Sequence, residues 1–260
     1  MTRTVEREYP HIPVPETVAG VMSAVQRPRE GERCVVFARW ALLEPEEGRF
    51  DPEALEALRQ QLIQLGTLGA EPVLCLYRGE SPAWFLEKGG WLREDNLRCY
   101  LRYVGKIVRT VGHLAEEYIT FYEPNALGWD ADTLWHTLTI LSHMACDHIR
   151  AYRLIRDIRQ QRGWGETAVG FVLRMYTPAE LRMGLLLRKN PTTAAGYQRL
   201  PLLAMALGRF ELPLRNVLRV QPGIWADFVG VTGSEDMSRR ESCCAAVESI
   251  TGIASRIMEE

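Results

Sequence analysis

Short apolar runs alternate with longer amphipathic stretches along most of this chain. Five runs rich in β-branched and aromatic residues have the length and composition of buried strands. Between them, apolar residues recur every three or four positions, which places them on one face of a helix. The pattern predicts strands at 34–40, 71–77, 118–123, 168–175 and 227–232, helices at 15–26, 53–66, 94–112, 131–161, 178–189, 194–207 and 238–258, and a short helical turn at 83–87.

Residues at the ends of these segments have the types that begin or end elements. Asp51 and Pro52 are suited to the N-cap and first position of a helix, and Gly69 is suited to ending that helix. Pro124 cannot donate to a sheet, so the third strand ends before it. Each crossover is long enough for a right-handed βαβ unit. The sequence therefore predicts one α/β domain over residues 1–260 with a parallel sheet, residues 1–14 being an irregular lead-in.

The predicted sheet is barrel-like and incomplete. A closed (β/α)8 barrel of the TIM type takes roughly 250 residues, and the chain has 260. The pattern contains five clear strands instead of eight, and three more cannot be located. An open barrel leaves strand edges that demand covering, and a homodimer that pairs or hides those edges is one solution.

Charge and hydropathy narrow the range of partners. A formal net charge of −2 gives no overall attraction to nucleic acid or to anionic membranes, and the arginines are spread along helices beside acidic residues. No uninterrupted apolar run approaches about 18 residues, and the N-terminus lacks the apolar core of a secretory signal. We therefore expect a cytoplasmic protein that binds neither nucleic acid nor membrane.

Cysteine and histidine patterns give little support to a metal or redox centre. The six scattered cysteines are expected to be reduced, mostly buried thiols. A redox or metal role is an alternative for the adjacent Cys243 and Cys244, but no CxxC spacing accompanies them. His143 and Asp147, one helical turn apart, are an alternative metal pair without further converging ligands. We expect no cofactor and no metal.

One acidic residue stands where α/β proteins place their chemistry. The run Tyr118-Ile-Thr-Phe-Tyr leads directly into Glu123 and Pro124, so Glu123 lies at the carboxyl end of a predicted strand. The alternative is an ordinary acid at a strand end that faces water. The stretch alone does not decide between the two interpretations.

The order of motifs from about residue 33 to residue 232 resembles family 1 glycoside hydrolases, the β-glucosidase and 6-phospho-β-glucosidase family. Five blocks follow one another in matching order and spacing, and together they cover about three quarters of the chain. The resemblance implies a (β/α)8 barrel and a retaining β-glycosidase. The blocks are Trp40 with Glu44-Pro-Glu-Glu-Gly48 and Phe50, Gly69 to Tyr77 with Ser81-Pro82 and Lys88 to Leu92, Ile119-Thr-Phe-Tyr-Glu-Pro-Asn125, Val169 to Leu173, and Asp227 to Val231.

The resemblance also implies roles for individual residues. Glu123 takes the position of the general acid/base, which protonates the leaving oxygen while a second carboxylate roughly 5–5.5 Å away forms the glycosyl intermediate. Arg78, Tyr122 and Asn125 match positions that line the sugar site. Aromatic rings stack on sugars or fill the core about equally often. Trp129, just after the acid motif, is the best placed for stacking among Trp40, Trp84, Trp91, Trp129 and Trp135.

The match fails in other parts of the family's site. The family nucleophile lies in a Thr-Glu-Asn-Gly motif on the seventh strand, and no such motif occurs here. The first strand, with its sugar-binding Gln, has no recognisable equivalent. The remaining differences are Arg78 and Gly79 in place of His and Trp, Tyr122 in place of Asn, Leu42 in place of Arg, and Thr232-Gly233 in place of a Tyr pair.

These differences predict a shortened relative that is weak or inactive as a β-glycosidase and acts as a sugar-binding protein or a scaffold. A lone acid cannot carry out double displacement. The alternative is an active retaining β-glycosidase in which Glu123 works with a relocated nucleophile such as Glu235, or with one from a second chain. Glu80 and Asp236 are further acids near strand ends, and Asp236 is also suited to capping a helix. A purely structural or interaction role is the third hypothesis.

Overall fold

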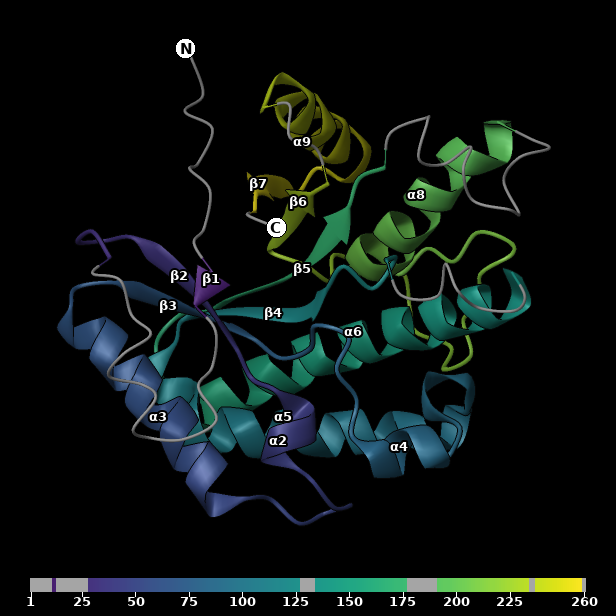
Figure 1. The fold of residues 1–260 in the computed structure, drawn as a ribbon. Helices are drawn as coiled ribbons and strands as arrows, with labels where there is room; N and C mark the ends of the chain where they lie inside the picture. The colour runs from purple at the N-terminus through teal and green to yellow at the C-terminus, as the bar shows by residue number, and fades with distance from the viewer. Residues whose placement is uncertain (1–10, 13–27, 127–133, 177–190, 234–236, 259–260) are drawn as a thin grey trace.

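The computed structural model describes residues 11–12, 28–126, 134–176, 191–233 and 237–258. A parallel sheet lies at its centre, and the described strands follow one another across the sheet in sequence order (Figure 1). The strands are β1 (His11–Ile12), β2 (Arg33–Phe37), β3 (Glu71–Cys75), β4 (Glu117–Tyr122), β5 (Ala168–Arg174), β6 (Phe228–Thr232) and β7 (Ala254–Ile257).

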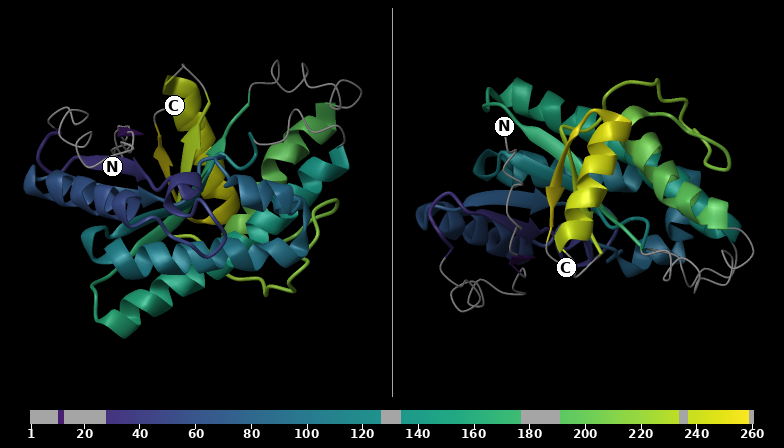
Figure 2. Two further views of the ribbon diagram at one scale, coloured as in Figure 1. Left: turned by 60° about the horizontal axis from the view of Figure 1, so that its bottom comes forward. Right: turned by 90° about the horizontal axis from the view of Figure 1, so that it is seen from above.

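Helices connect successive parallel strands and form the outer layer of the fold. Within this layer α3 packs on α5, α5 on α6, α6 on α8 and α8 on α9, an order that Figure 2 shows from two sides. None of the described helices is both long enough and apolar enough to cross a membrane. The helices are α2 (Trp40–Leu43), α3 (Pro52–Thr67), α4 (Ala83–Glu87), α5 (Leu97–Val111), α6 (Leu134–Arg162), α8 (Pro191–Leu207) and α9 (Met237–Thr251), with 3-10 turns η1 (Gly90–Leu92), η2 (Glu94–Asn96) and η3 (Gly112–Leu114).

Sequential parallel strands with helices on the outside are the arrangement of a TIM barrel. In the described part of the chain the sheet runs from β1 to β7 without joining these two edges. The fold is therefore an incomplete (β/α) barrel, as the sequence predicts.

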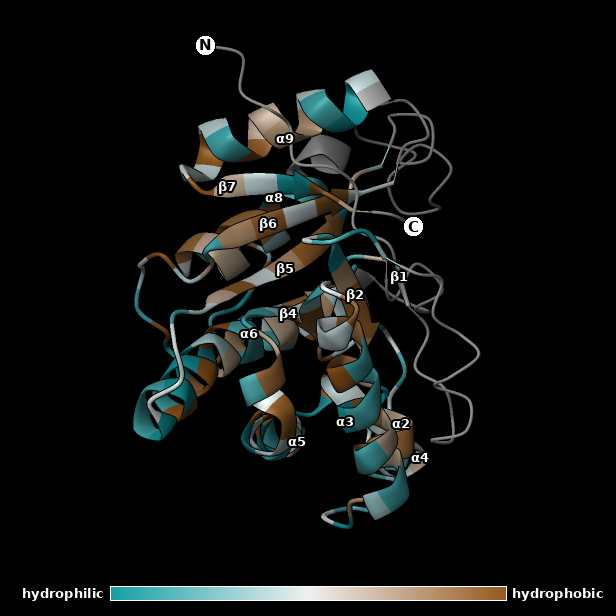
Figure 3. Cartoon of the chain, turned by 90° about the vertical axis from the view of Figure 1, so that its left-hand side faces the viewer, coloured by the Kyte–Doolittle hydropathy of each residue, from teal (hydrophilic) through white to brown (hydrophobic). Residues whose placement is uncertain are grey.

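The sheet is buried on both of its faces. All five residues of β6 and five of the six in β4 are buried, and Figure 3 shows the strands as mostly apolar and the helices as mixed. Burial on both faces is expected of a parallel sheet covered by helices. Because strands of this kind read as continuous apolar runs, their sequence pattern identifies them well.

Local signals in the sequence explain several element boundaries. Asp51 caps α3 as predicted, since its carboxylate accepts from Glu53 N at 2.8 Å and from Ala54 N at 2.9 Å. Gly69 follows this helix with a φ of 79°, a conformation that glycine adopts without a Cβ penalty. The predicted helical turn at 83–87 is α4.

Three predicted boundaries are wrong. Trp40 belongs to α2 and not to the strand, because Arg39 O accepts from Leu43 N at 3.0 Å and begins the helix. The predicted helix at 238–258 ends at Thr251, and Gly252, with a φ of 72°, turns the chain into β7. The predicted lead-in contains β1, which pairs with β2. The predicted helices at 15–26 and 178–189 lie outside the described residues, as does the start of the one at 131–161.

Candidate active site

Glu123 directly follows β4, at the edge where the carboxyl ends of the parallel strands meet. Its N–H donates to Val172 O on β5 at 2.9 Å, and its carbonyl accepts from Ala126 N at 2.9 Å. Held by these bonds, Glu123 has a left-handed backbone with a φ of 51°, which costs a non-glycine residue about 1–2 kcal/mol. Strain of this kind concentrates at functional sites, which favours a functional acid over an ordinary one.

The strand before Glu123 is irregular. The pairing of β4 with β5 shifts register between Ile119 and Tyr122. A bulge changes the direction in which the following side chains point, and bulges are frequent beside active sites. The shift therefore helps to direct the Glu123 side chain toward the neighbouring strand ends.

The Glu123 carboxylate faces the ends of β5 and β6. Thr232 Oγ1 donates a hydrogen bond to Oε1, and Arg174 Nη1 lies 4.0 Å from Oε2. The Glu123 side chain is 18% exposed, so the carboxylate is mostly shielded from water. Among the described residues its side-chain partners are a hydroxyl and a guanidinium, and neither is the second carboxylate that a retaining mechanism needs.

Asn125 fixes the position of Arg174. The buried Asn125 amide donates to Arg174 O at 2.6 Å and accepts from Arg174 N at 3.0 Å. These two bonds tie the chain after β4 to the end of β5. The amide of Asn125, expected at the sugar site, is thus engaged with backbone in the described structure and holds the arginine beside Glu123.

Arg78 and Tyr122 lie together at the neighbouring strand ends. The Arg78 guanidinium lies 5.3 Å from the centroid of the Tyr122 ring and 4.7 Å from that of Phe37. Tyr122 is 2% exposed and meets the Phe37 ring edge to face at 5.6 Å. A guanidinium over two rings is a favourable cation–π arrangement. The structure thus brings Arg78 to Tyr122, the residue that directly precedes Glu123.

The remaining predicted site residues are not brought to Glu123 by the described structure. Glu80 pairs with Arg39 at 2.9 Å. Trp129 and Glu235 lie outside the described residues, so their roles stay predictions. Sequence reasoning missed Arg174 and Thr232 as contacts of Glu123. The available signal was that each lies at or next to the end of a predicted strand, the position that Tyr122 has in β4.

Two tryptophans that were candidates for sugar stacking fill the core instead. Trp40 is 1% exposed and stacks on Tyr103 with ring centroids 5.1 Å apart. Trp91 is 6% exposed and donates to Tyr77 OH at 3.0 Å. Both belong to an aromatic cluster under α2, α4 and α5. The core interpretation is therefore correct for these two rings.

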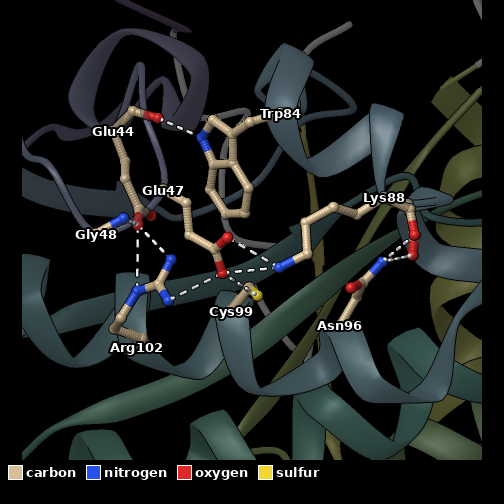
Figure 4. Close-up of polar contacts among 9 residues, drawn as sticks. Glu44, Glu47, Gly48, Trp84, Lys88, Asn96, Cys99 and Arg102 are labelled. Atoms are coloured by element: carbon tan, nitrogen blue, oxygen red, sulfur yellow. Dashed lines mark hydrogen bonds and ion pairs between the residues drawn. The ribbon is translucent and has the colours of Figure 1, made fainter.

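The Glu44-Pro-Glu-Glu-Gly48 block makes polar contacts that connect several elements (Figure 4). Glu44, which is fully buried, accepts from Arg102 Nη2 at 2.5 Å, from Gly48 N at 2.7 Å and from Trp40 Nε1 at 2.8 Å. Glu47 pairs with Lys88 at 2.8 Å, and that hydrogen bond is the main reason for its lowered pKa. These contacts join the turn after α2 to α4 and α5.

The metal and redox candidates are engaged or buried. His143 Nδ1 lies 2.6 Å from Trp91 O, and the Asp147 carboxylate pairs with Arg150 at 3.2 Å. His148 Nε2 bonds to Trp225 O at 2.8 Å and its Nδ1 bonds to Thr120 Oγ1 at 2.6 Å, and burial lowers the pKa of His148 to about 3. All six cysteines are free thiols and five are buried. No three His, Cys, Asp or Glu side chains gather as metal ligands among the described residues.

Fold and site together define this protein as an incomplete TIM-type barrel that carries an acid at the carboxyl edge of its sheet. No family model matches the chain. Over 96 residues the chain is 29% identical to a cytosolic β-glucosidase of Cavia porcellus, a match that covers 35% of this chain and 20% of that protein.

Solved structures of β-glycosidases share the fold. A β-glycosidase from Pyrococcus horikoshii is 24% identical with a TM-score of 0.63, over 83% of this chain and 50% of that one. A β-glucosidase from Exiguobacterium marinum is 19% identical with a TM-score of 0.61, over 77% and 51%. A Thermotoga maritima β-glucosidase in complex with deoxynojirimycin is 19% identical with a TM-score of 0.62, over 78% and 49%. The resemblance to family 1 glycoside hydrolases is thus confirmed for the fold, and the chain spans about half the length of these structures.

Proposed function

We propose that this protein binds a β-linked sugar at the carboxyl edge of the sheet and is weak or inactive as a β-glycosidase. The observation that carries the proposal is the surroundings of Glu123, whose side-chain partners in the described part of the chain are Thr232 and Arg174. An acid without an opposing carboxylate cannot form the glycosyl intermediate. Loss of one member of such a catalytic unit lowers the rate by a factor on the order of 10⁴–10⁶.

The same edge offers groups that suit a sugar. Arg78 and Arg174 present guanidinium N–H donors to hydroxyl oxygens, and the Glu123 carboxylate accepts from hydroxyl hydrogens. Trp129 supplies the stacking face in this proposal. The structural neighbours are a β-glucosidase and a β-glycosidase, which supports a β-glycoside as the ligand class.

One observation favours an active enzyme as the second candidate. Sequence analysis predicts no seventh strand, yet β7 pairs in parallel with β6, and Met258 N donates to Val231 O at 2.9 Å. Met258 is followed in the sequence by Glu259 and Glu260, which lie outside the described residues. Glu259 therefore joins Glu235 as a candidate for the nucleophile in a retaining mechanism.

Leaving-group dependence separates the two functions. Hydrolysis of 2,4-dinitrophenyl and 4-methoxyphenyl β-glucosides is measured for the wild type and for Glu123→Gln, Glu235→Gln and Glu259→Gln. An active enzyme loses far more rate on the poor leaving group in Glu123→Gln, because only that group needs protonation. An active enzyme loses rate on both substrates in whichever variant, Glu235→Gln or Glu259→Gln, removes its nucleophile. The matched control is Glu80→Gln, an acid after β3 that pairs with Arg39.

The proposed function predicts no hydrolysis that depends on Glu123, together with saturable calorimetric binding of deoxynojirimycin that Arg174→Ala weakens. Rates in the wild type that fall strongly in Glu123→Gln and in one other variant would establish the active enzyme instead. Absence of deoxynojirimycin binding, with no hydrolysis, would reject both functions.

A further inference from the structure

We propose a second saccharide-binding site on the outside of the barrel, separate from Glu123. A cavity of about 750 Å³ lies between the N-terminal half of α6, the turns η1 and η2, and the chain at 213–217. Its volume is within the roughly 300–1,000 Å³ of small-molecule sites. Its lining includes Trp135, His143, Arg93, Glu94 and Arg215 and shares no residue with the surroundings of Glu123 described above.

Trp135 gives the cavity an aromatic wall. Its side chain is 64% exposed, and among the tryptophans that the structure describes it alone is exposed. Leu92 beside it in the lining is 38% exposed. A large aromatic ring that is exposed to water within a cavity contributes binding free energy when an apolar surface of a ligand covers it. The C–H face of a pyranose ring is such a partner, and its hydroxyls remain free for polar groups.

His143 supplies a buried acceptor at the cavity. The residue is 4% exposed, and its Nδ1 lies 2.6 Å from Trp91 O. A carbonyl oxygen only accepts, so Nδ1 carries the proton in the neutral ring and Nε2 keeps a lone pair. Nε2 has no hydrogen-bond partner among the described residues, and His143 lines the cavity. A hydroxyl of a sugar is the donor that this nitrogen lacks.

The rim of the cavity carries both hydrogen-bond donors and hydrogen-bond acceptors. Arg93 and Arg215 bring guanidinium groups, whereas Glu94 and Asp95 bring carboxylates. Arg93 and Asp95 are 3.8 Å apart and largely exposed, which leaves both able to turn toward a ligand. Two positive and two negative groups favour a neutral ligand with many hydroxyls over an anion or a cation.

The walls are fixed before any ligand binds. Ser142 Oγ accepts from Arg215 N at 2.9 Å and donates to Leu138 O at 2.6 Å, which ties the chain at 213–217 to α6. Asn96 donates to Lys88 O and to Gly90 O, both at 3.0 Å, and thereby holds η1. A site formed in advance needs less ordering of side chains on binding.

The test follows the indole N–H signals of the full chain by NMR during titration with cellotriose and, separately, maltotriose. Trp135 is assigned as the signal missing in Trp135→Phe. We expect at least one of the two sugars to shift the Trp135 signal saturably, and Trp135→Ala to weaken binding tenfold or more. Arg215→Ala should weaken it several-fold, whereas Ile224→Ala, a change at a 67% exposed residue outside the lining, should not.

Two outcomes would overturn the proposal. One is a Trp135 signal that does not move with either sugar up to its solubility limit. The other is binding of unchanged strength in Trp135→Ala. The experiment is repeated in Glu123→Gln and with deoxynojirimycin present. Because the two sites share no described residue, neither change should alter the Trp135 titration, and failure at one site is distinguishable from failure at the other.

Discussion

Replacement of Glu44 by Gln tests whether charge holds the turn after α2. The carboxylate is fully buried and accepts from Arg102, Gly48 and Trp40 at 2.5 to 3.1 Å. Gln keeps the volume but replaces one acceptor oxygen by an NH2 group that must face another donor. Breaking a buried pair costs about 3–5 kcal/mol. Since the Arg102 side chain is 38% exposed and can be rehydrated, the expected loss is about 2–3 kcal/mol.

The assay is equilibrium unfolding in urea, followed by tryptophan fluorescence, with the loss taken from the midpoint and slope. Glu47→Gln is the matched control, because Glu47 lies in the same turn but is 39% exposed where it pairs with Lys88. Its loss should stay below about 1 kcal/mol and shrink in high salt. Equal losses in the two variants would refute the reasoning, since burial would then add nothing to the strength of these contacts.

Three further changes test the fold elsewhere. Burial lowers the pKa of His148 to about 3 from its usual 6.5, so the unfolded chain takes up the proton first as the pH falls. Stability should therefore decline between these two values, and urea midpoints should decline less in His148→Gln. Gly170→Ala should cost about 1–3 kcal/mol or more in the same assay, because its Cβ would lie 2.4 Å from a carbonyl oxygen of β6, whereas Gly165→Ala meets nothing within 4 Å and should be neutral. Arg256→Ala, which removes the 2.5 Å contact between β7 and Glu117, should speed hydrogen exchange in β7 while β5 stays protected; equal rates in the two strands would contradict this.

Elements with strong local signals could be predicted from the sequence. The helix α3 carries its own cap at Asp51, its own terminator at Gly69 and a clear apolar face, and β4 to β6 are continuous apolar runs. By contrast, β7 carries Ser255 and Arg256 at its centre, and its strand state depends on pairing with β6. A short polar strand of this kind continues the pattern of the preceding helix, which explains the error.

The candidate site could be located but not assembled from the sequence. Glu123 is identifiable because an apolar run leads into it and a proline follows. Its contacts with Thr232 and Arg174 depend on how β4, β5 and β6 are staggered, and a register shift in β4 alters that stagger. Its positive φ has no sequence signal, because a glutamate is not a residue type that favours this conformation.

Curvature of the open sheet links its stability to the candidate site. Arg256 on β7 reaches Glu117 on β4, three strands away, at 2.5 Å, and Arg33 on β2 approaches the same carboxylate to 3.5 Å. The Glu117 side chain is only 14% exposed, so these charges meet on a largely covered face. A flat sheet would hold β4 and β7 about 14 Å apart, at the usual spacing of neighbouring strands. The sheet must therefore curl, and the same curl brings Thr232 to Glu123 across β5. The two ion pairs of Glu117 therefore hold the open sheet in the curved form on which the contact between Thr232 and Glu123 depends.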